Sequence, residues 1–118
     1  MEIKSENEQK PGYEVLAETE ERVILFAAAM DGVEVSETEK SLDELEELAK
    51  TAGAETVLRV LQKRPKPDPV FCVGKGKAEE LSLRCQAAQA DVVIFDEELS
   101  GVMQKNLEET LRLKVVDR

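Results

Sequence analysis

Residues 23–29 read Val-Ile-Leu-Phe-Ala-Ala-Ala, an unbroken apolar run that decides the fold of this chain. A strand with one face in solvent alternates apolar and polar residues, whereas a strand covered on both faces is apolar throughout. Residues 91–96 hold a second buried run, Val-Val-Ile-Phe between two aspartates. The two runs therefore predict the central strands of a mostly parallel sheet with helices on both faces.

The first helix is predicted from a capping-box pattern. Ser41 and Glu44 have the spacing of a capping box, in which the serine caps the helix and the glutamate three residues later bonds back to it. Gly53 is expected to end the helix. Residues 33–39 would then be a connecting loop. The inward face of this helix would carry Leu42, Leu45, Leu48, Ala49 and Ala52.

The remaining elements continue the alternation of strand and helix. Residues 56–61 are β-branched and apolar and predict a second strand, and Lys-Val-Val-Asp at residues 114–117 is expected to be a short fourth strand. A helix is expected over residues 78–88, with Ala78, Leu81, Cys85 and Ala88 inward. Another follows a Ser100 cap, with Met103, Leu107 and Leu111 on one face. The order β-α-β-α-β-α-β predicts an α/β domain with a four-stranded sheet, and we expect strand order 2-1-3-4.

Composition limits the chemistry of the chain. Its 118 residues are long enough for one domain, 42% are hydrophobic, and the net charge is −10. Histidine is absent, which removes the commonest general base and metal ligand. We expect residues 1–21 to be an acidic, mobile arm with Tyr13, Val15 and Leu16 as its only anchors, and residues 22–118 to be the domain. Cys72 and Cys85 are expected to be reduced core residues of a cytoplasmic protein without a membrane span.

A basic stretch interrupts this acidic chain. Residues 59–77 hold six Lys or Arg and one acid, a local charge of +5, together with three of the four prolines. The stretch could be a rigid solvated connector, or a site for an anionic partner. A glycine–lysine turn that opens a helix favours an anion, because helix N-termini expose N–H groups. The candidate contact residues are Lys63, Arg64, Lys66, Gly74, Lys75, Gly76 and Lys77.

The sequence gives less support for a nucleotide-binding or a metal-binding site. The glycine–lysine turn does not match the P-loop pattern G-x-x-x-x-G-K-[ST], since Ala78 follows Lys77. Asp31 and the acids of residues 96–98 would share the carboxyl edge of the sheet and could hold Mg²⁺, but they lack the partners of a receiver-type site. We therefore expect no catalytic residue, no cofactor and no metal site in this chain.

Seven stretches of the sequence resemble the N-terminal domain of HflX-type GTPases. They occur in the family's order and at its spacing from about residue 22 to residue 118. The stretches are SLDELEELA (41–49), AGAE (52–55), LQKRPKPDP (61–69), VGKGKAEEL (73–81), ADVVIFDEELS (90–100), QKNLEE (104–109) and KVVDR (114–118). Gly101, where relatives often have proline, and Cys72, where they usually have a bulkier apolar residue, depart from the family's pattern.

The resemblance implies a domain of a ribosome-associated GTP-binding protein. Its expected partners are the 50S subunit, through rRNA, and the G domain of the same protein, with no DNA. The chain ends where the family's helical arm would begin and holds no G-domain motif. GTP and Mg²⁺ are therefore expected only for the G domain of full-length relatives, and this chain alone is not expected to be an enzyme. Two alternatives remain, a free-standing protein-interaction module and a phosphate- or small-anion-binding domain at residues 74–77.

Overall fold

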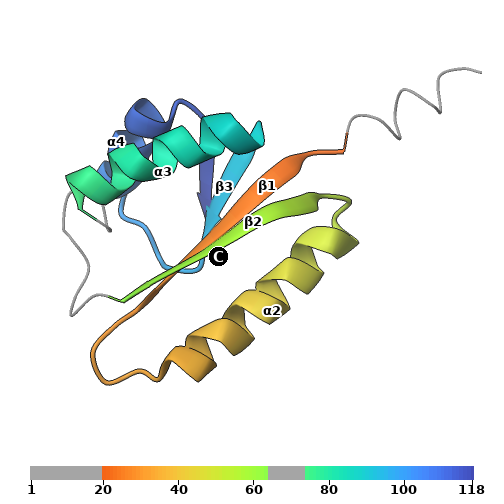
Figure 1. Cartoon of the computed structure of the whole chain (residues 1–118), viewed down its shortest axis with the longest axis vertical. Coiled ribbons are helices and arrows are strands. Elements are labelled where there is room, and N and C mark those ends of the chain that lie inside the picture. The colour runs from red at the N-terminus through yellow and green to blue at the C-terminus, as the bar shows by residue number, and fades with distance from the viewer. Residues whose placement is uncertain (1–19, 64–73) are drawn as a thin grey trace, which may run out of the picture.

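The structure is a computed structural model that describes residues 20–63 and 74–118. Strands and helices alternate along these residues, and all four described strands run parallel in the order β2-β1-β3-β4 (Figure 1). The elements are β1 (Arg22–Ala29), α2 (Val35–Thr51), β2 (Glu55–Lys63), α3 (Lys75–Ala88), β3 (Val92–Phe95), α4 (Gly101–Leu111) and β4 (Lys114–Asp117). The predicted α/β class, the four-stranded parallel sheet and its strand order are confirmed.

The central strand is β1, as its apolar run predicted. Every residue from Val23 to Ala29 is buried, and β1 is hydrogen-bonded to β2 on one side and β3 on the other. Side chains of a strand point alternately to its two faces. Ile24 and Phe26 accordingly enter one core, whereas Val23 and Leu25 enter the other. A single strand thus contributes to both cores of the domain.

The two faces of the sheet are covered unequally. One core lies under α3 and α4, where the rings of Phe26 and Phe95 pack with centroids 5.1 Å apart. The other core lies under α2, which contributes Leu42, Leu45 and Ala49. Figure 1 shows α3 and α4 together on one side of the sheet and α2 on the other. The predicted helical layers on both faces are confirmed.

The predicted start of the first helix is wrong. The loop expected at residues 33–39 is mostly helical, because α2 begins at Val35 and Ser41 lies inside it. The cap position belongs to Glu34, whose side chain makes no capping hydrogen bond. Two residues expected to face inward, Leu48 and Ala52, are exposed, and 58% of the Leu48 surface is accessible.

The end of α2 agrees with its sequence signal. Gly53 has a φ of 90°, and its N–H donates to the Lys50 carbonyl at 3.0 Å. The next N–H, that of Ala54, reaches back to the Ala49 carbonyl at 2.9 Å. This pair of bonds is a Schellman motif, which satisfies carbonyls that the last helical turn leaves free.

The later elements differ from the predictions mainly at their ends. Strand β2 extends two residues beyond the predicted end, and α3 begins at Lys75 rather than Ala78. Of the four residues predicted to face inward from α3, Ala88 is only half-buried. Ser100 caps α4 as predicted, since its Oγ accepts from the Met103 N–H at 3.1 Å. Residues 1–19 of the predicted arm lie outside the described residues.

Helix α4 also closes the outer edge of β4. The Gln104 side chain donates to the Val115 carbonyl at 2.9 Å, and the Val115 N–H donates to Glu108 at 3.3 Å. Both backbone groups of Val115 are therefore bonded on the side away from β3. An edge strand whose backbone groups are already bonded cannot accept a further strand there.

Candidate anion-binding surface at the carboxyl edge of the sheet

The predicted contact residues that the structure describes lie at the end of β2 and the start of α3. Lys63 is the last residue of β2, and Gly74 immediately precedes α3. Lys75, Gly76 and Lys77 form the first turn of α3 (Figure 1). We call these five residues the basic surface. Arg64 and Lys66, the other two predicted contacts, lie outside the described residues.

The start of α3 exposes backbone donors. Gly74 has a φ of 88°, a left-handed conformation that glycine adopts without steric cost, and its carbonyl accepts from the Ala78 N–H at 3.0 Å. The first turn contains no acid, and among the described residues no side chain caps it. The N–H groups there carry part of the positive end of the helix dipole. This turn can therefore donate to a phosphate or carboxylate oxygen.

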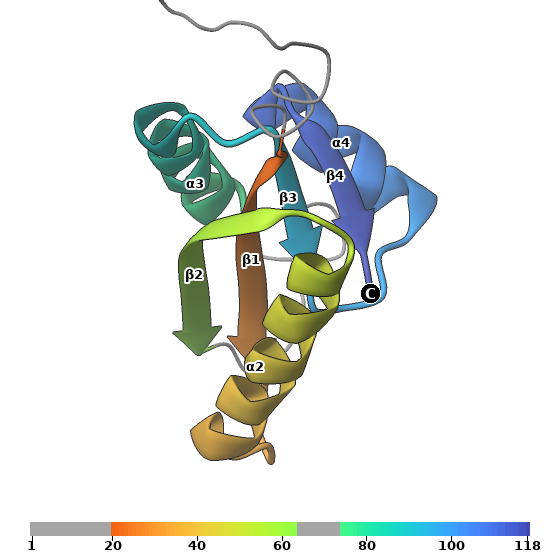
Figure 2. The same cartoon turned by 90° about the vertical axis from the view of Figure 1, so that its right-hand side faces the viewer.

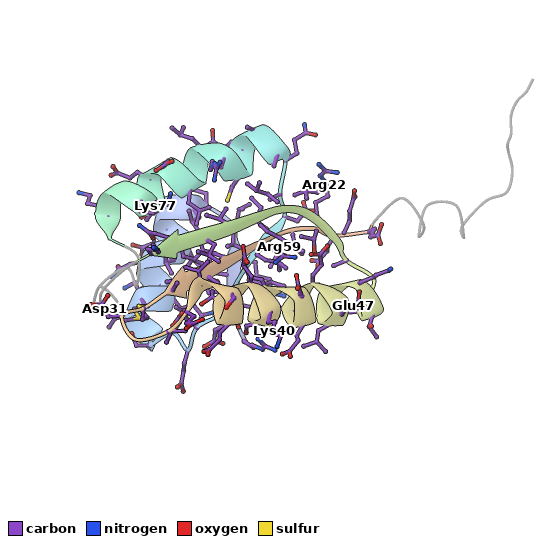
Figure 3. The ribbon with its side chains drawn as sticks, turned by 60° about the horizontal axis from the view of Figure 1, so that its bottom comes forward. Arg22, Asp31, Lys40, Glu47, Arg59 and Lys77 are labelled. Atoms are coloured by element: carbon purple, nitrogen blue, oxygen red, sulfur yellow. The ribbon has the colours of Figure 1, made fainter. Side chains whose placement is uncertain are left out.

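The two lysines of the first turn differ in exposure and in their contacts. Lys75 is exposed, whereas Lys77 is partly buried and lies 3.5 Å from Glu80. An exposed ion pair of that length is weak, so it does not prevent Lys77 from facing another anion. Figure 3 shows Lys77 and Asp31 near one end of the described body and Arg22 and Glu47 near the other. Lys77 is thus separated from Glu47 in the later turns of α2 and lies at the same end of the domain as Asp31.

The acids predicted at the same edge are engaged by an arginine. Asp96, directly after β3, lies 2.8 Å from the Arg118 guanidinium. The same guanidinium donates to Ser41 and lies 3.1 Å from Glu44, both on α2. Hydrogen bonds to Asp96 and Glu44 raise the pKa of Arg118. Arg118 therefore joins the end of β4 to β3 and α2, and it uses a carboxylate that a cation would need.

Glu97 has a different environment. Burial and the neighbouring Asp96 raise the pKa of its carboxyl group, although a backbone hydrogen bond with Ala28 partly opposes the shift. Glu97 and Asp96 line a cavity of about 350 Å³ between the end of β1, the loop after it and the first turns of α2. The cavity lies at the switch point of the sheet, where neighbouring crossovers leave in opposite directions. Within residues 20–63 and 74–118, no cluster of carboxylates and thiols could hold a metal ion.

Cys85 is the buried core residue that the sequence predicted. It is a free cysteine in the core under α3, and burial raises the pKa of its thiol to about 11. A thiol with that pKa stays protonated at neutral pH and is a poor nucleophile. Cys72 lies outside the described residues.

Three arginine networks were missed by the sequence reasoning. Arg118 is described above. Arg59 of β2 lies 2.7 Å from Asp43 and 3.0 Å from Glu46, which binds β2 to the outer side of α2. Arg22 donates to the Ala88 carbonyl at 2.9 Å and so binds the last turn of α3. Their partners lie 13 to 77 residues away in sequence, and no local sequence pattern predicts such contacts.

Comparison with known proteins decides the family. The family model described as "GTP-binding GTPase N-terminal" matches residues 39–118. This chain belongs to the N-terminal domain family of HflX GTPases. The GTPase HflX of Caldanaerobacter subterraneus is 45% identical over 105 residues, which cover 89% of this chain and 24% of the relative. The HflX of Lacrimispora saccharolytica is 47% identical over 103 residues, covering 87% and 24%. The Escherichia coli HflX is 38% identical over 79 residues, covering 67% and 18%.

The match extends over only part of the HflX proteins. This chain spans about a quarter of the length of the first two of these relatives. The matched part includes the basic surface from Lys63 to Lys77, because the family model begins at residue 39. None of the helices in the described part of the chain has the length and apolar character needed to cross a bilayer.

Proposed function

We propose that this domain contributes to contact between an HflX-type GTPase and the large ribosomal subunit, with the basic surface facing rRNA. The observation that carries the proposal is the first turn of α3, which combines N–H groups that no described side chain caps with Lys75 and Lys77 and contains no acid. Phosphate contacts in nucleic-acid complexes come from lysines, arginines and helix N-termini of this kind. Family membership supports the same conclusion, because the relatives are HflX GTPases.

The net charge of −10 is compatible with a local contact of this kind. Charges are screened over about 8 Å at physiological salt, so acids on distant faces act weakly on the basic surface. A site that neutralises only a few phosphates binds with a moderate affinity that salt weakens. We therefore expect weak binding by this domain alone and useful affinity when it is linked to other ribosome contacts.

The proposal assigns no catalysis to this chain. We infer that GTP and Mg²⁺ bind the G domain of full-length relatives, since the sequence here contains no P-loop pattern. The basic surface and the acidic faces around it could also touch that G domain and modulate it. Ribosome contact further implies that the protein works in the cytoplasm.

Sedimentation with purified 50S subunits tests the rRNA contact. The chain is compared with a Lys75→Ala, Lys77→Ala variant at low and at physiological salt. We expect the parent to pellet with the subunits at low salt and less at physiological salt, because counterion release weakens phosphate contacts. The variant is expected to lose most of its pelleting at both salt concentrations.

A matched variant controls for net charge. Lys40→Ala with Lys50→Ala removes the same charge from α2, on the opposite face of the sheet, and is expected to bind as the parent does. Equal loss in both variants would point to net charge rather than to the basic surface. Absence of binding by the parent at any salt would contradict the proposal for this domain. A phosphate-dependent rise in melting temperature that the Lys75, Lys77 variant lacks would favour the small-anion alternative instead.

A further inference from the structure

The α2 side of the sheet has an apolar groove that no described helix covers. Helix α2 lies on the side of the sheet where it packs on β1 and β2 (Figure 2). Strands β3 and β4 contribute Val92, Ile94 and Val116 to this same side. These side chains line a groove of about 560 Å³ at the amino end of the strands. Its other lining residues are Glu20, Glu21, Val23, Ala52, Gly53, Ala54 and Lys114. Ile94 and Val116 are only half-buried there.

Parallel sheets are normally covered on both faces, so we expect a further segment to cover this groove. Ten residues line it, whereas a stable protein–protein interface uses about 20–30 residues on each side. The groove is therefore too small to hold a second folded copy of the chain by itself. Its volume suits a short segment that inserts a few large side chains.

We propose that residues 13–17 of this chain, Tyr-Glu-Val-Leu-Ala, bind in the groove. Glu20 and Glu21 line it, so the residues before them leave the sheet from its rim. Glu20 lies seven positions after Tyr13, and an extended chain of seven residue steps reaches up to about 25 Å. The segment can therefore reach Ile94 and Val116 without any change in the sheet.

The chemistry of the segment matches the groove. Tyr13, Val15 and Leu16 are its large apolar side chains, and they stand among residues 1–21, which are rich in glutamate. Glu14 and Glu18 lie between and beside them, and the rim of the groove carries one opposite charge, Lys114, beside the acids Glu20 and Glu21. The match therefore rests on the apolar side chains, which would enter the groove. This occupant does not depend on the proposed ribosome contact.

Fluorescence of Tyr13 tests the proposal on the full chain. Tyr13 is the only tyrosine and the chain has no tryptophan, so tyrosine emission reports this residue alone. We expect acrylamide to quench the parent several-fold less than a free tyrosine amide. Leu16→Asp should bring quenching up to the level of the free amide, because burying one large apolar side chain favours the bound state about tenfold or more. We expect this change to leave the described strands and cores folded, which circular dichroism of the variant checks.

A matched substitution and a contact measurement complete the test. Ile3→Asp introduces the same charge far from the proposed contact and should leave Tyr13 protected. In the parent, nuclear Overhauser contacts should join the Tyr13 ring to methyl groups of Ile94 and Val116. Quenching of the parent equal to that of the free amide, or protection that survives Leu16→Asp, would overturn the proposal. So would contacts that appear only between differently labelled copies, since these would make a second molecule the occupant.

Discussion

Two residues, Gln89 and Arg112, hold a left-handed backbone although neither is glycine. Their φ values are 55° and 58°, and each ends a helix. In this conformation the Cβ atom crowds the following carbonyl, at a cost of about 1–2 kcal/mol. At α4 the strained residue lets the Arg112 N–H donate to the Glu108 carbonyl at 2.8 Å. The helix end is thus stabilised by a backbone hydrogen bond and destabilised by the left-handed conformation of the residue that donates it.

Replacing Arg112 with glycine should stabilise the domain. Glycine adopts this conformation without the Cβ clash, but it loses more backbone freedom on folding. We expect a net gain of about 0.5–1 kcal/mol in the free energy of unfolding. Urea denaturation followed by circular dichroism measures the change.

Arg112→Ala is the control for this prediction. It removes the same side chain while keeping the Cβ atom, so its stability should stay close to that of the parent. A gain equal to that of the glycine variant would show that the side chain, and not the backbone conformation, carries the cost.

The helices of this domain begin in different ways. Helix α4 begins at a serine whose Oγ accepts from the Met103 N–H, whereas α2 begins at Glu34, which makes no side-chain capping bond. Helix α3 follows a glycine, and no side chain of the described residues caps its first turn. A cap satisfies an N–H group that the helix itself cannot pair. The start of α4 is therefore stabilised by its own serine, whereas the start of α3 has no such partner among the described side chains.

Removing the α4 cap should weaken the domain by a measurable amount. Ser100→Ala deletes the oxygen that accepts from Met103, and we expect a loss of about 1 kcal/mol in the free energy of unfolding. Ser100→Asp keeps an acceptor at the cap and should stay near the parent. The two variants are compared in urea denaturation. A loss shared by both would mean that the cap bond is not the cause.

The sequence predicted the elements well and their boundaries less well. Val23–Ala29 is apolar throughout because helices cover both faces of the sheet there, and the same apolar pattern identified it and Val92–Phe95 as the central strands. The start of α2 was missed because its first buried residue, Thr38, is polar and gives no hydrophobic signal. The capping-box pattern at Ser41 then pointed to a false start, since that serine binds Arg118 instead.

The candidate site was predictable only in part. Local charge and the glycine–lysine turn identified residues that the structure places at the start of α3, where a helix N-terminus can bind an anion. The arginine contacts were not predictable, because Arg118 meets Ser41 across 77 residues of sequence. The groove beside α2 was also invisible in the sequence. It arises from how one helix sits on four strands, and no local pattern encodes that placement.

At the scale of the whole molecule, stability depends on pH through Glu97. Burial and Asp96 raise the pKa of this carboxyl group above its ordinary value of 4.5. Between that value and the raised one, the folded state binds more protons than the unfolded state. The contribution of Glu97 to stability is therefore greatest below pH 4.5 and is lost as the pH rises through the raised pKa of the folded state.

Glu97→Gln should remove this dependence. The glutamine stays uncharged, so we expect the variant to be more stable than the parent at neutral pH and equal to it below about pH 4.5. Urea denaturation across a pH series measures both profiles. Glu98→Gln changes an exposed neighbour and should leave the profile unaltered. A Glu97 variant whose profile runs parallel to that of the parent at every pH would contradict the prediction.

The parallel sheet also sets how the domain responds to tension. The described part of the chain enters at the amino edge of β1 and leaves at the carboxyl edge of β4, at opposite ends of strands that all point one way. A pull on these two points therefore acts along the strands. It loads the β1–β3 and β3–β4 hydrogen bonds together in shear instead of peeling them apart one at a time. Arg22 and Arg118, each bound to a different helical layer, stand where that load would enter and leave.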